Sequence, residues 1–308
     1  MPDRKFDLIV AGEINPDLIL TDPQLEPRFG QAEIIVKDAA LTPGSSSVIF
    51  ACGAARLGLK VAFVGVAGDD VFGNFMLEAL ESRGVDISNV IVDPNQTTGF
   101  TVILNRVTDR AMLTHLGAIN ALIADQIPND LLVQARHLHI ASYFLQTRLQ
   151  PDIPALFRRA RVLGLTTSLD TNWDPSEQWT GVHDLLPLVD VFLPNENEAC
   201  ALAKMDSVTD SARTLGADSK IVAVKMGAEG GLAVEGATLV QAPAIPVEVV
   251  DTVGAGDTFD AGFIYGYLAG WSLEKSLRLG IACGSFSASK PGGLEGQPTL
   301  AKALGAVS

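Results

Sequence analysis

The sequence has little basic charge for its length. Lysine and arginine together number 22, against 36 aspartate and glutamate residues, which gives a formal net charge of −14. Binding to nucleic acid or to an anionic membrane requires a basic face that releases counterions, so this balance argues against both partners. A small anionic substrate held by a local site remains compatible with it.

Cysteines and long apolar runs are also scarce. Cys52, Cys200 and Cys283 are too few and too far apart for a disulfide framework or a zinc cluster. The longest near-apolar run, Ala261 to Trp271, falls well short of the ~20 residues that span a bilayer. The start of the chain, Met1 to Asp7, lacks the apolar stretch of a signal peptide. We therefore expect a cytoplasmic protein in a reducing compartment.

Short β-branched runs alternate with longer amphipathic stretches along the chain. This order predicts crossover connections, and hence an α/β, doubly wound, mostly parallel sheet with helices on both faces. The predicted strands are Phe6–Ala11, Val61–Val66, His137–Ala141, Leu165–Asp170, Val189–Leu193, Ile221–Lys225 and Pro246–Val250. The predicted helices are Ser45–Leu57, Asp70–Ser82, Asp152–Leu163 and His183–Leu188.

Two stretches, residues 14–38 and 97–115, interrupt the alternation and contain no convincing helix. Thr101–Asn105 and Ala111–Thr114 have the pattern of hairpin strands joined by a turn at Thr108–Arg110. No linker rich in proline, glycine or serine marks a boundary. We interpret residues 1–308 as a single domain that carries a small, separate β-sheet lid, with ordinary surface hairpins as the alternative.

The segment Asp251–Phe259 carries the strongest chemical signal. Gly254 and Gly256 allow a ligand to approach the backbone closely. Free N–H groups and the dipole of the helix that follows form an anion site. Asp257 lies in the first turn of that helix, where its carboxylate can take a proton from a substrate hydroxyl. This arrangement suits phosphoryl transfer, although a structural turn with a helix-starting aspartate is the alternative.

Two common nucleotide-binding motifs are absent from the sequence. No segment matches the Walker loop G-x-x-x-x-G-K-[ST]. The dinucleotide-binding fingerprint fails at Phe259, which stands where its third glycine should be.

Five segments, in order, resemble motifs of the ribokinase-like (PfkB) carbohydrate kinases. Gly12–Asp17 resembles the opening strand with its sugar-binding aspartate, and Ala55–Gly73 resembles the N-terminal signature region. Asn195–Glu198 is similar to the N-x-x-E motif, and Lys225–Gly231 to the nucleotide-binding K-x-G-x-x-G segment. Asp251–Phe259 resembles the C-terminal signature. The resemblance covers nearly the whole chain.

This resemblance implies a ribokinase-like fold and ATP-dependent phosphorylation of a hydroxyl on a sugar or sugar-like small molecule. Asp257 would be the base, and Asn195 and Glu198 would organise Mg²⁺ through water, as suits a hard cation. The anion hole would consist of the N–H groups of Gly254, Ala255 and Gly256. The implied nucleotide-binding positions are Asn195, Lys225, Gly227, Gly230, Thr252, Gly254, Gly256, Cys283 and Phe286.

Many members of that family also bind a monovalent cation beside the anion hole. Only Asp251 offers a charged ligand here, and Gly296 falls where an oxygen-bearing side chain is often found, so K⁺ is implied less strongly. The matching positions are Asp251, Val253, Ser287, Lys290 and Gly292.

The expected acceptor site departs from the family pattern. A double glycine followed by a sugar-binding asparagine is usual there, but Ser45 replaces the second glycine and Ile49 replaces the asparagine. Loss of an amide that bonds a hydroxyl implies a different substrate, or one held by other residues. Asp170 and Asn172 follow a strand and resemble the family's D-x-N loop near the substrate. The predicted substrate-binding residues are Asp17, Gly44, Ser45, Asp170 and Asn172.

Two other functions remain open at this stage: a nucleoside kinase of the same superfamily, and a non-catalytic sugar- or nucleotide-binding protein on the same fold. Asp257 separates the second from a kinase, because only a kinase needs this base. The resemblance also implies a homodimer formed through the lid, since exposed sheet edges need covering.

Overall fold

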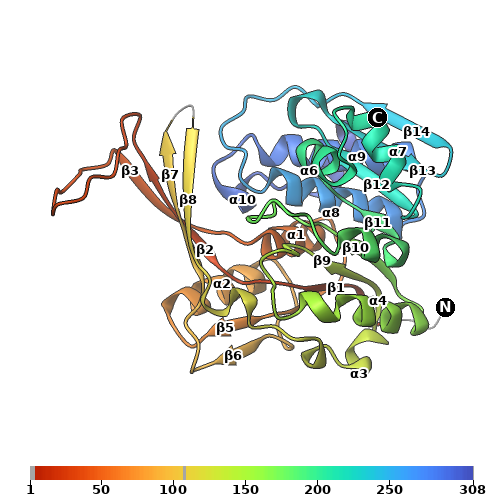
Figure 1. Cartoon of the computed structure of the whole chain (residues 1–308), viewed down its shortest axis with the longest axis horizontal. Helices are drawn as coiled ribbons and strands as arrows, with labels where there is room; N and C mark the ends of the chain where they lie inside the picture. Colours follow the sequence, from red (N-terminus) through yellow and green to blue (C-terminus); the bar gives the residue numbers. More distant parts are fainter. Residues whose placement is uncertain (1–3, 107–108, 308) are drawn as a thin grey trace.

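The chain forms one large and one small β-sheet (Figure 1). The structure is a computed structural model that describes residues 4–106 and 109–307. The large sheet has the strand order β14-β13-β12-β11-β10-β9-β1-β4, parallel except for β13 and β14 at one edge. Its strands are β1 (Phe6–Ala11), β4 (Val61–Val64), β9 (Ala135–Ile140), β10 (Thr166–Leu169), β11 (Val191–Phe192), β12 (Ile221–Lys225), β13 (Gly231–Glu235) and β14 (Thr238–Ala242).

Helices cover both faces of the large sheet because its strands are apolar on both sides. In β1, Ile9 and Ala11 belong to the core on one face and Leu8 and Val10 to the core on the other. Such two-sided burial is typical of parallel sheets and confirms the predicted fold class. One face carries α3 (Asn129–Leu132), α4 (Ile153–Val162), α5 (Val182–Leu185), α6 (Glu196–Ala203) and α7 (Val208–Leu215). The other carries α1 (Ser46–Arg56), α2 (Val71–Ser82), α8 (Ala255–Leu268), α9 (Leu273–Ser287), α10 (Gly292–Glu295) and α11 (Leu300–Gly305).

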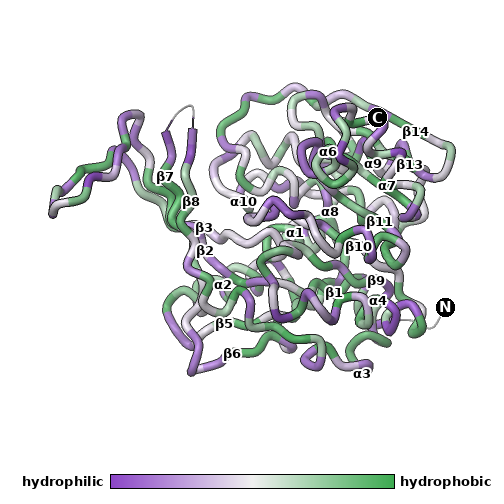
Figure 2. The backbone as a smooth tube through the Cα atoms, in the orientation of Figure 1, coloured by the Kyte–Doolittle hydropathy of each residue, from purple (hydrophilic) through white to green (hydrophobic). Residues whose placement is uncertain are grey.

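The small sheet projects from the body formed by the large sheet and its helices (Figure 1). Its order is β3-β2-β7-β8, with β2 parallel to β7 and the other pairs antiparallel. Figure 2 shows hydrophobic stretches along β7 and β8, and every residue of β8 is exposed. The strands are β2 (Pro16–Thr21), β3 (Asp38–Pro43), β7 (Phe100–Arg106) and β8 (Asp109–His115), and a separate pair joins β5 (Val66–Gly68) to β6 (Ile91–Asp93).

The predicted strand at Pro246–Val250 is wrong. This segment is an extended connection that leaves the edge strand β14 and crosses α9 to reach the start of α8. Its backbone is held by α9 and its C-terminal end: Ile245 N donates to Ser285 Oγ, and Val250 N to the Ala288 carbonyl. The β-branched residues favoured a strand, but Val249 and Val250 remain exposed, at 62% and 57%.

Three smaller predictions also need correction. The strand predicted at Val61–Val66 breaks at Gly65, where a Cβ would lie 2.6 Å from the Gly12 carbonyl oxygen. Asp109 and Arg110 begin β8 and do not form the predicted turn, while Thr108 lies outside the described residues. The helix predicted at His183–Leu188 divides into α5 and a 3-10 turn.

In the part of the chain that the structure describes, no helix is both long and apolar enough to cross a lipid bilayer.

Candidate active site

Polar side chains gather where neighbouring parallel strands of the large sheet end. Glu13 follows β1, Asp170 follows β10, Asn195 follows β11, and Lys225 is the last residue of β12. Because parallel strands end at one edge of a sheet, these residues come together there. Helix α8 begins at the same place and brings Asp257 to the group, since carboxylate oxygens of Asp170, Asp257 and Asp260 lie within 4.8 Å of one another.

Lys225 lies between the aspartates of this cluster. Its Nζ atom is 2.9 Å from Asp170 Oδ2 and 2.9 Å from Asp260 Oδ2. Both carboxyl groups are almost fully buried. The lysine side chain passes close to the first turn of α8, where a Cβ on Gly256 would lie 3.4 Å from Lys225 Cδ. The predicted nucleotide-binding lysine is therefore engaged inside the protein as the counter-charge of two aspartates.

The cluster gives its carboxyl groups different protonation behaviour. Burial, followed by the negative charge of Asp170, raises the pKa of Asp257 to about 7, while Lys225 acts in the opposite direction. Burial also raises the pKa of Asp260 well above its ordinary range. For Asp170, the ammonium of Lys225 and hydrogen bonds outweigh burial and lower the pKa. Asp257 can thus both accept and release a proton near neutral pH.

The turn before α8 requires glycine at position 254. Gly254 caps the helix with φ 70°, a left-handed conformation that other residues rarely adopt. A Cβ there would also lie 2.8 Å from Gly293 Cα and 2.9 Å from Ile49 Cγ2. Of the three N–H groups predicted to form an anion hole, that of Ala255 lies 3.3 Å from the Thr252 carbonyl. The residue at the usual asparagine position, Ile49, thus packs against this turn.

Asp17 lies at the start of the small sheet and faces Gly44. A Cβ on Gly44 would lie 2.4 Å from the carboxyl carbon of Asp17, so only glycine permits this approach. Burial raises the pKa of Asp17 to about 7, against the opposing positive charge of Arg110 from β8. The positive charge of a guanidinium from β8 thus acts on a carboxyl group from β2.

Serines at the start of α1 surround the buried carboxylate of Glu13. Ser45 caps α1: its hydroxyl accepts from Val48 N at 3.1 Å and donates to the Glu13 carbonyl at 2.7 Å. Ser47 and Ser142 donate to the Glu13 carboxylate at 2.5 and 2.9 Å. The hydroxyl of Ser45 is thus engaged by the protein, which weighs against its predicted contact with substrate.

Asn172 links these serines to the aspartate cluster. With its amide oriented toward Asp170, its nitrogen donates to Asp170 Oδ2 at 3.2 Å, and its oxygen lies 2.5 Å from Ser46 Oγ and 3.0 Å from Ser142 Oγ. Ser46 also hydrogen-bonds to Asp257. The structure therefore brings the predicted residues Asp170 and Asn172 next to Asp257.

Sequence reasoning missed three residues of this site: Glu13, Ser46 and Asp260. Asp260 lies three residues after Asp257, a spacing that places two helical side chains on one face. Ser46 is the middle residue of the run Ser45–Ser47, and no sequence motif singled it out from its two neighbours. For Glu13, the position of a carboxylate directly after a buried strand was the available signal.

Asn195 and Glu198 cap α6 reciprocally. Asn195 N and Nδ2 donate to the Glu198 carboxylate at 2.9 and 2.6 Å, and Glu198 N donates to Asn195 Oδ1 at 2.9 Å. Burial, followed by the charge of Asp170, raises the pKa of Glu198 to about 7. Carboxylate and amide oxygens are a donor set that suits Mg²⁺ through water, and these oxygens already bond within the cap, so a water-mediated role fits them better than direct coordination.

The residues predicted to hold a monovalent cation surround the turn before α8. The Asp251 carboxylate accepts from Val253 N at 3.0 Å and from Gly292 N at 2.9 Å, which ties α10 to this turn. Ser287 is fully buried and Lys290 is exposed. At Gly296 a Cβ would lie 2.3 Å from the Ser287 carbonyl oxygen, so backbone packing explains the glycine. A cation at these positions stays a prediction.

One predicted nucleotide contact needs correction. Cys283 lies in the core between α8 and α9 with no exposed surface, and a Cβ on Gly262 would lie 2.8 Å from its sulfur. Burial raises the pKa of this thiol to about 12. Gly227 and Gly230 have positive φ angles in the turn after β12, Thr252 is exposed, and Phe286 is half-buried. These four positions stay predictions.

Comparison with known proteins gives concordant similarities. The sequence pattern of the pfkB family carbohydrate kinases matches residues 5–300. The chain is 30% identical to an ATP-dependent ribose-1-phosphate kinase of Halopiger xanaduensis, over 92% of this chain and 93% of that protein. It is 32% identical to a 2-dehydro-3-deoxygluconokinase of Bacillus subtilis, over 89% and 88%. A putative ribokinase II of E. coli in complex with ATP and Mg²⁺ shares the fold, with a TM-score of 0.86, 24% identity and coverage of 98% and 99%.

The raised pKa of Asp257 predicts a pH-dependent gain in stability for Asp257→Asn. The pKa rises from 3.8 to about 7 on folding, so ionisation destabilises the folded state as pH rises through this range. Asparagine carries no charge, so the variant should be more stable by about 1–3 kcal/mol at about pH 8.5, and the gain should shrink at about pH 5.5. Urea denaturation at both pH values measures the difference, with the exposed Asp69→Asn as control. Equal midpoints for variant and wild type at the higher pH would contradict the prediction.

Proposed function

The chain belongs to the pfkB family of carbohydrate kinases, and on this premise we propose that it transfers the γ-phosphoryl group of ATP to a hydroxyl of a sugar or sugar-like molecule. The observation that carries the proposal is the position of Asp257, at the start of α8 and within the buried aspartate cluster. A carboxyl group with a pKa of about 7 is well matched to proton transfer at neutral pH.

In the proposed reaction, the acceptor oxygen attacks the γ-phosphorus while Asp257 takes the hydroxyl proton. The bond from the γ-phosphorus to the β,γ-bridging oxygen breaks, and ADP leaves with that oxygen. N–H groups of Gly254, Ala255 and Gly256 would hold the charge on the transferring group. Bound Mg²⁺ would supply neutralisation of phosphate charge, and Asn195 with Glu198 would hold it through water.

On the acceptor side, Asp17 and Asn172 are the groups proposed to bind hydroxyls. The positive charge of Arg110 acts on Asp17, and Asn172 contacts the network that reaches Asp257. Ile49 offers no hydrogen bond where the family usually has an amide. The two curated relatives are named for a sugar phosphate and a sugar acid, so the acceptor panel should contain both beside neutral sugars and nucleosides. A nucleoside kinase and a non-catalytic binding protein remain the alternatives, and K⁺ beside Asp251 remains part of the proposal.

We propose that the small sheet acts as a lid over the acceptor and pairs with the same sheet of a second copy. Leu41, Met112 and Leu113 expose apolar surface on its strands, at 40%, 61% and 60%. Covering such surface favours association. We expect sedimentation to show a dimer in wild type, and the double variant Met112→Lys/Leu113→Lys to be monomeric. A wild-type monomer at micromolar concentration would exclude this pairing.

Asp257→Asn should abolish turnover. Loss of a positioned general base costs about 10²–10⁴-fold in rate, because the acceptor hydroxyl keeps its proton. ADP release with Mg-ATP, measured against the acceptor panel, tests this, with Asp69→Asn as the control. Binding of ATP should survive in the variant. Turnover that persists undiminished in Asp257→Asn would remove the proposed base, and ligand binding without turnover on any acceptor would favour a binding protein.

Lys225→Met should move the acid limb of the pH profile of kcat/KM upward. The positive charge of Lys225 lowers the pKa of Asp257, so its removal makes the base harder to ionise. We expect the limb, near pH 7 in wild type, to rise by about one unit. Lys225→Arg keeps the charge and should leave the limb near its wild-type position. Because loss of this cation also lowers stability, the profile is measured at a temperature where circular dichroism shows Lys225→Met to be folded. An unchanged limb in the folded variant would show that this lysine does not tune Asp257.

A further inference from the structure

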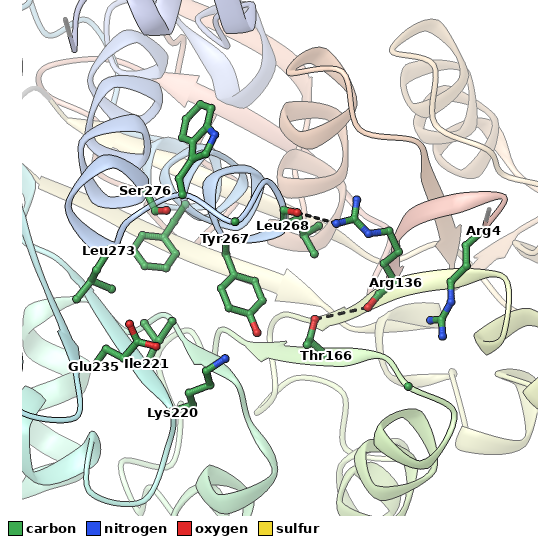
Figure 3. Close-up of a pocket in the computed structure, with 14 residues that line it drawn as sticks. Arg4, Arg136, Thr166, Lys220, Ile221, Glu235, Tyr267, Leu268, Leu273 and Ser276 are labelled. Atoms are coloured by element: carbon green, nitrogen blue, oxygen red, sulfur yellow. Dashed lines mark hydrogen bonds between the residues drawn. The ribbon is translucent and has the colours of Figure 1, made fainter. Parts of the chain in front are cut away.

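A cavity of ≈ 400 Å³ (Figure 3) lies where the parallel strands of the large sheet begin, whereas Asp257 lies where they end. Its lining comes from the beginnings of parallel strands: Arg4 precedes β1, Arg136 and Thr166 lie at the starts of β9 and β10, and Lys220 precedes β12. The end of α8 and the beginning of α9 complete it. The aspartate cluster lies at the ends of the same strands, so the length of the strands separates this cluster from the cavity.

The cavity concentrates positive charge in an acidic protein. Arg4, Arg136 and Lys220 line it together with one carboxylate, that of Glu235, whereas the whole chain has a net charge of −14. Arg136 already pairs with Asp7 at 3.0 Å. Across residues 4–106 and 109–307, neither Arg4 nor Lys220 forms an ion pair with a carboxylate. Two cations therefore retain their charge for a ligand.

Backbone carbonyls hold both guanidinium groups in place, and only that of Arg136 is also paired with a carboxylate. Arg4 donates to the carbonyls of Ala135 and Leu163, and Arg136 donates to that of Leu268 at 2.6 Å. A guanidinium held in this way keeps other N–H groups that can donate to an oxyanion. The arginines are thus oriented before any ligand binds.

The remaining lining suits a ligand with an oxyanion and an organic part. The Tyr267 hydroxyl points toward the side of the cavity where Lys220 and Thr166 lie (Figure 3). The Lys220 ammonium is 5.4 Å from the centroid of the Tyr267 ring. Glu235 pairs in register with Ile221 and lies on the side away from Arg136 (Figure 3). A volume of ≈ 400 Å³ falls in the range of small-molecule sites, about 300–1,000 Å³.

We propose that this cavity binds the phosphate group of a small phosphorylated metabolite, at a site separate from the catalytic edge of the sheet. Arg4 and Lys220 contribute the charge that the protein leaves unpaired. Arg136 and Tyr267 contribute further hydrogen-bond donors, and the aromatic side chains at the end of α8 contact the organic part. Phosphate suits such a site because its several oxygens accept bonds from arginine and lysine together.

Isothermal titration of the whole protein with inorganic phosphate and with glucose 6-phosphate tests the proposal. Trp271 lines the cavity, so its fluorescence gives a second signal. We expect saturable binding of both probes, competition by sulfate and none by glucose. Lys220→Gln and Arg4→Gln should each weaken binding by about 10-fold, as expected for loss of a charge-assisted hydrogen bond. Lys204→Gln, an exposed lysine elsewhere on the chain, should bind like wild type.

Phosphorylated probes can also bind at the proposed active site, and the cavity variants distinguish binding there from binding in the cavity. A phosphate signal that keeps its wild-type affinity in both Lys220→Gln and Arg4→Gln would assign binding to the catalytic edge and overturn the proposal. Absence of saturable phosphate binding in wild type would overturn it as well. Unchanged thermal melting and unchanged turnover without added phosphate would show that the variants are folded, so that a loss of binding reports on the cavity. The binding assay does not depend on the kinase activity, so either proposal can fail alone.

Discussion

The ammonium of Lys225, held 2.9 Å from both Asp170 and Asp260, is the interaction on which the candidate site depends. Three aspartates so close together would repel one another, and the two that are buried, Asp170 and Asp260, would also lose their hydration. A single cation between two of them stabilises the charged form of Asp170, while Asp260 favours its protonated form. Removal of one partner from such a buried group is strongly destabilising, because an uncompensated charge remains.

This ion group also joins three separate elements. Asp170 follows β10, Lys225 ends β12, and Asp260 lies in the first turns of α8. Its geometry therefore fixes where α8 begins relative to the sheet, and with it the position of Asp257. The caps of the neighbouring helices complete the arrangement: Ser45 binds Glu13 at the start of α1, and Asn195 binds Glu198 at the start of α6. Several polar groups near Asp257 thus have a structural role whether or not they contact a substrate.

Charge is distributed unevenly between the two edges of the large sheet. The ends of the parallel strands carry the aspartates, where one lysine compensates only part of the negative charge. The beginnings of the same strands carry Arg4, Arg136 and Lys220 around a cavity. The net charge of −14 does not reveal this difference between the two edges, because it is a sum over the whole chain. Local charge and oriented N–H donors, rather than net charge, determine where a protein can bind phosphate-bearing molecules.

The sequence by itself determined the fold class and the family, and it singled out Asp251–Phe259 as the segment proposed for catalysis. These features are local: hydrophobic periodicity reports which faces are buried, and Asp251–Phe259 forms one turn with the start of one helix. The tertiary structure decided which groups meet. Lys225 bonds to residues 55 and 35 positions away, and Ser45 meets Glu13 across 32 positions. Cys283, a predicted nucleotide contact, has no exposed surface because the packing of α8 against α9 encloses it. The pattern of Pro246–Val250 favoured a strand, but a strand also needs a neighbouring edge to pair with, and only the folded chain determines whether one is there.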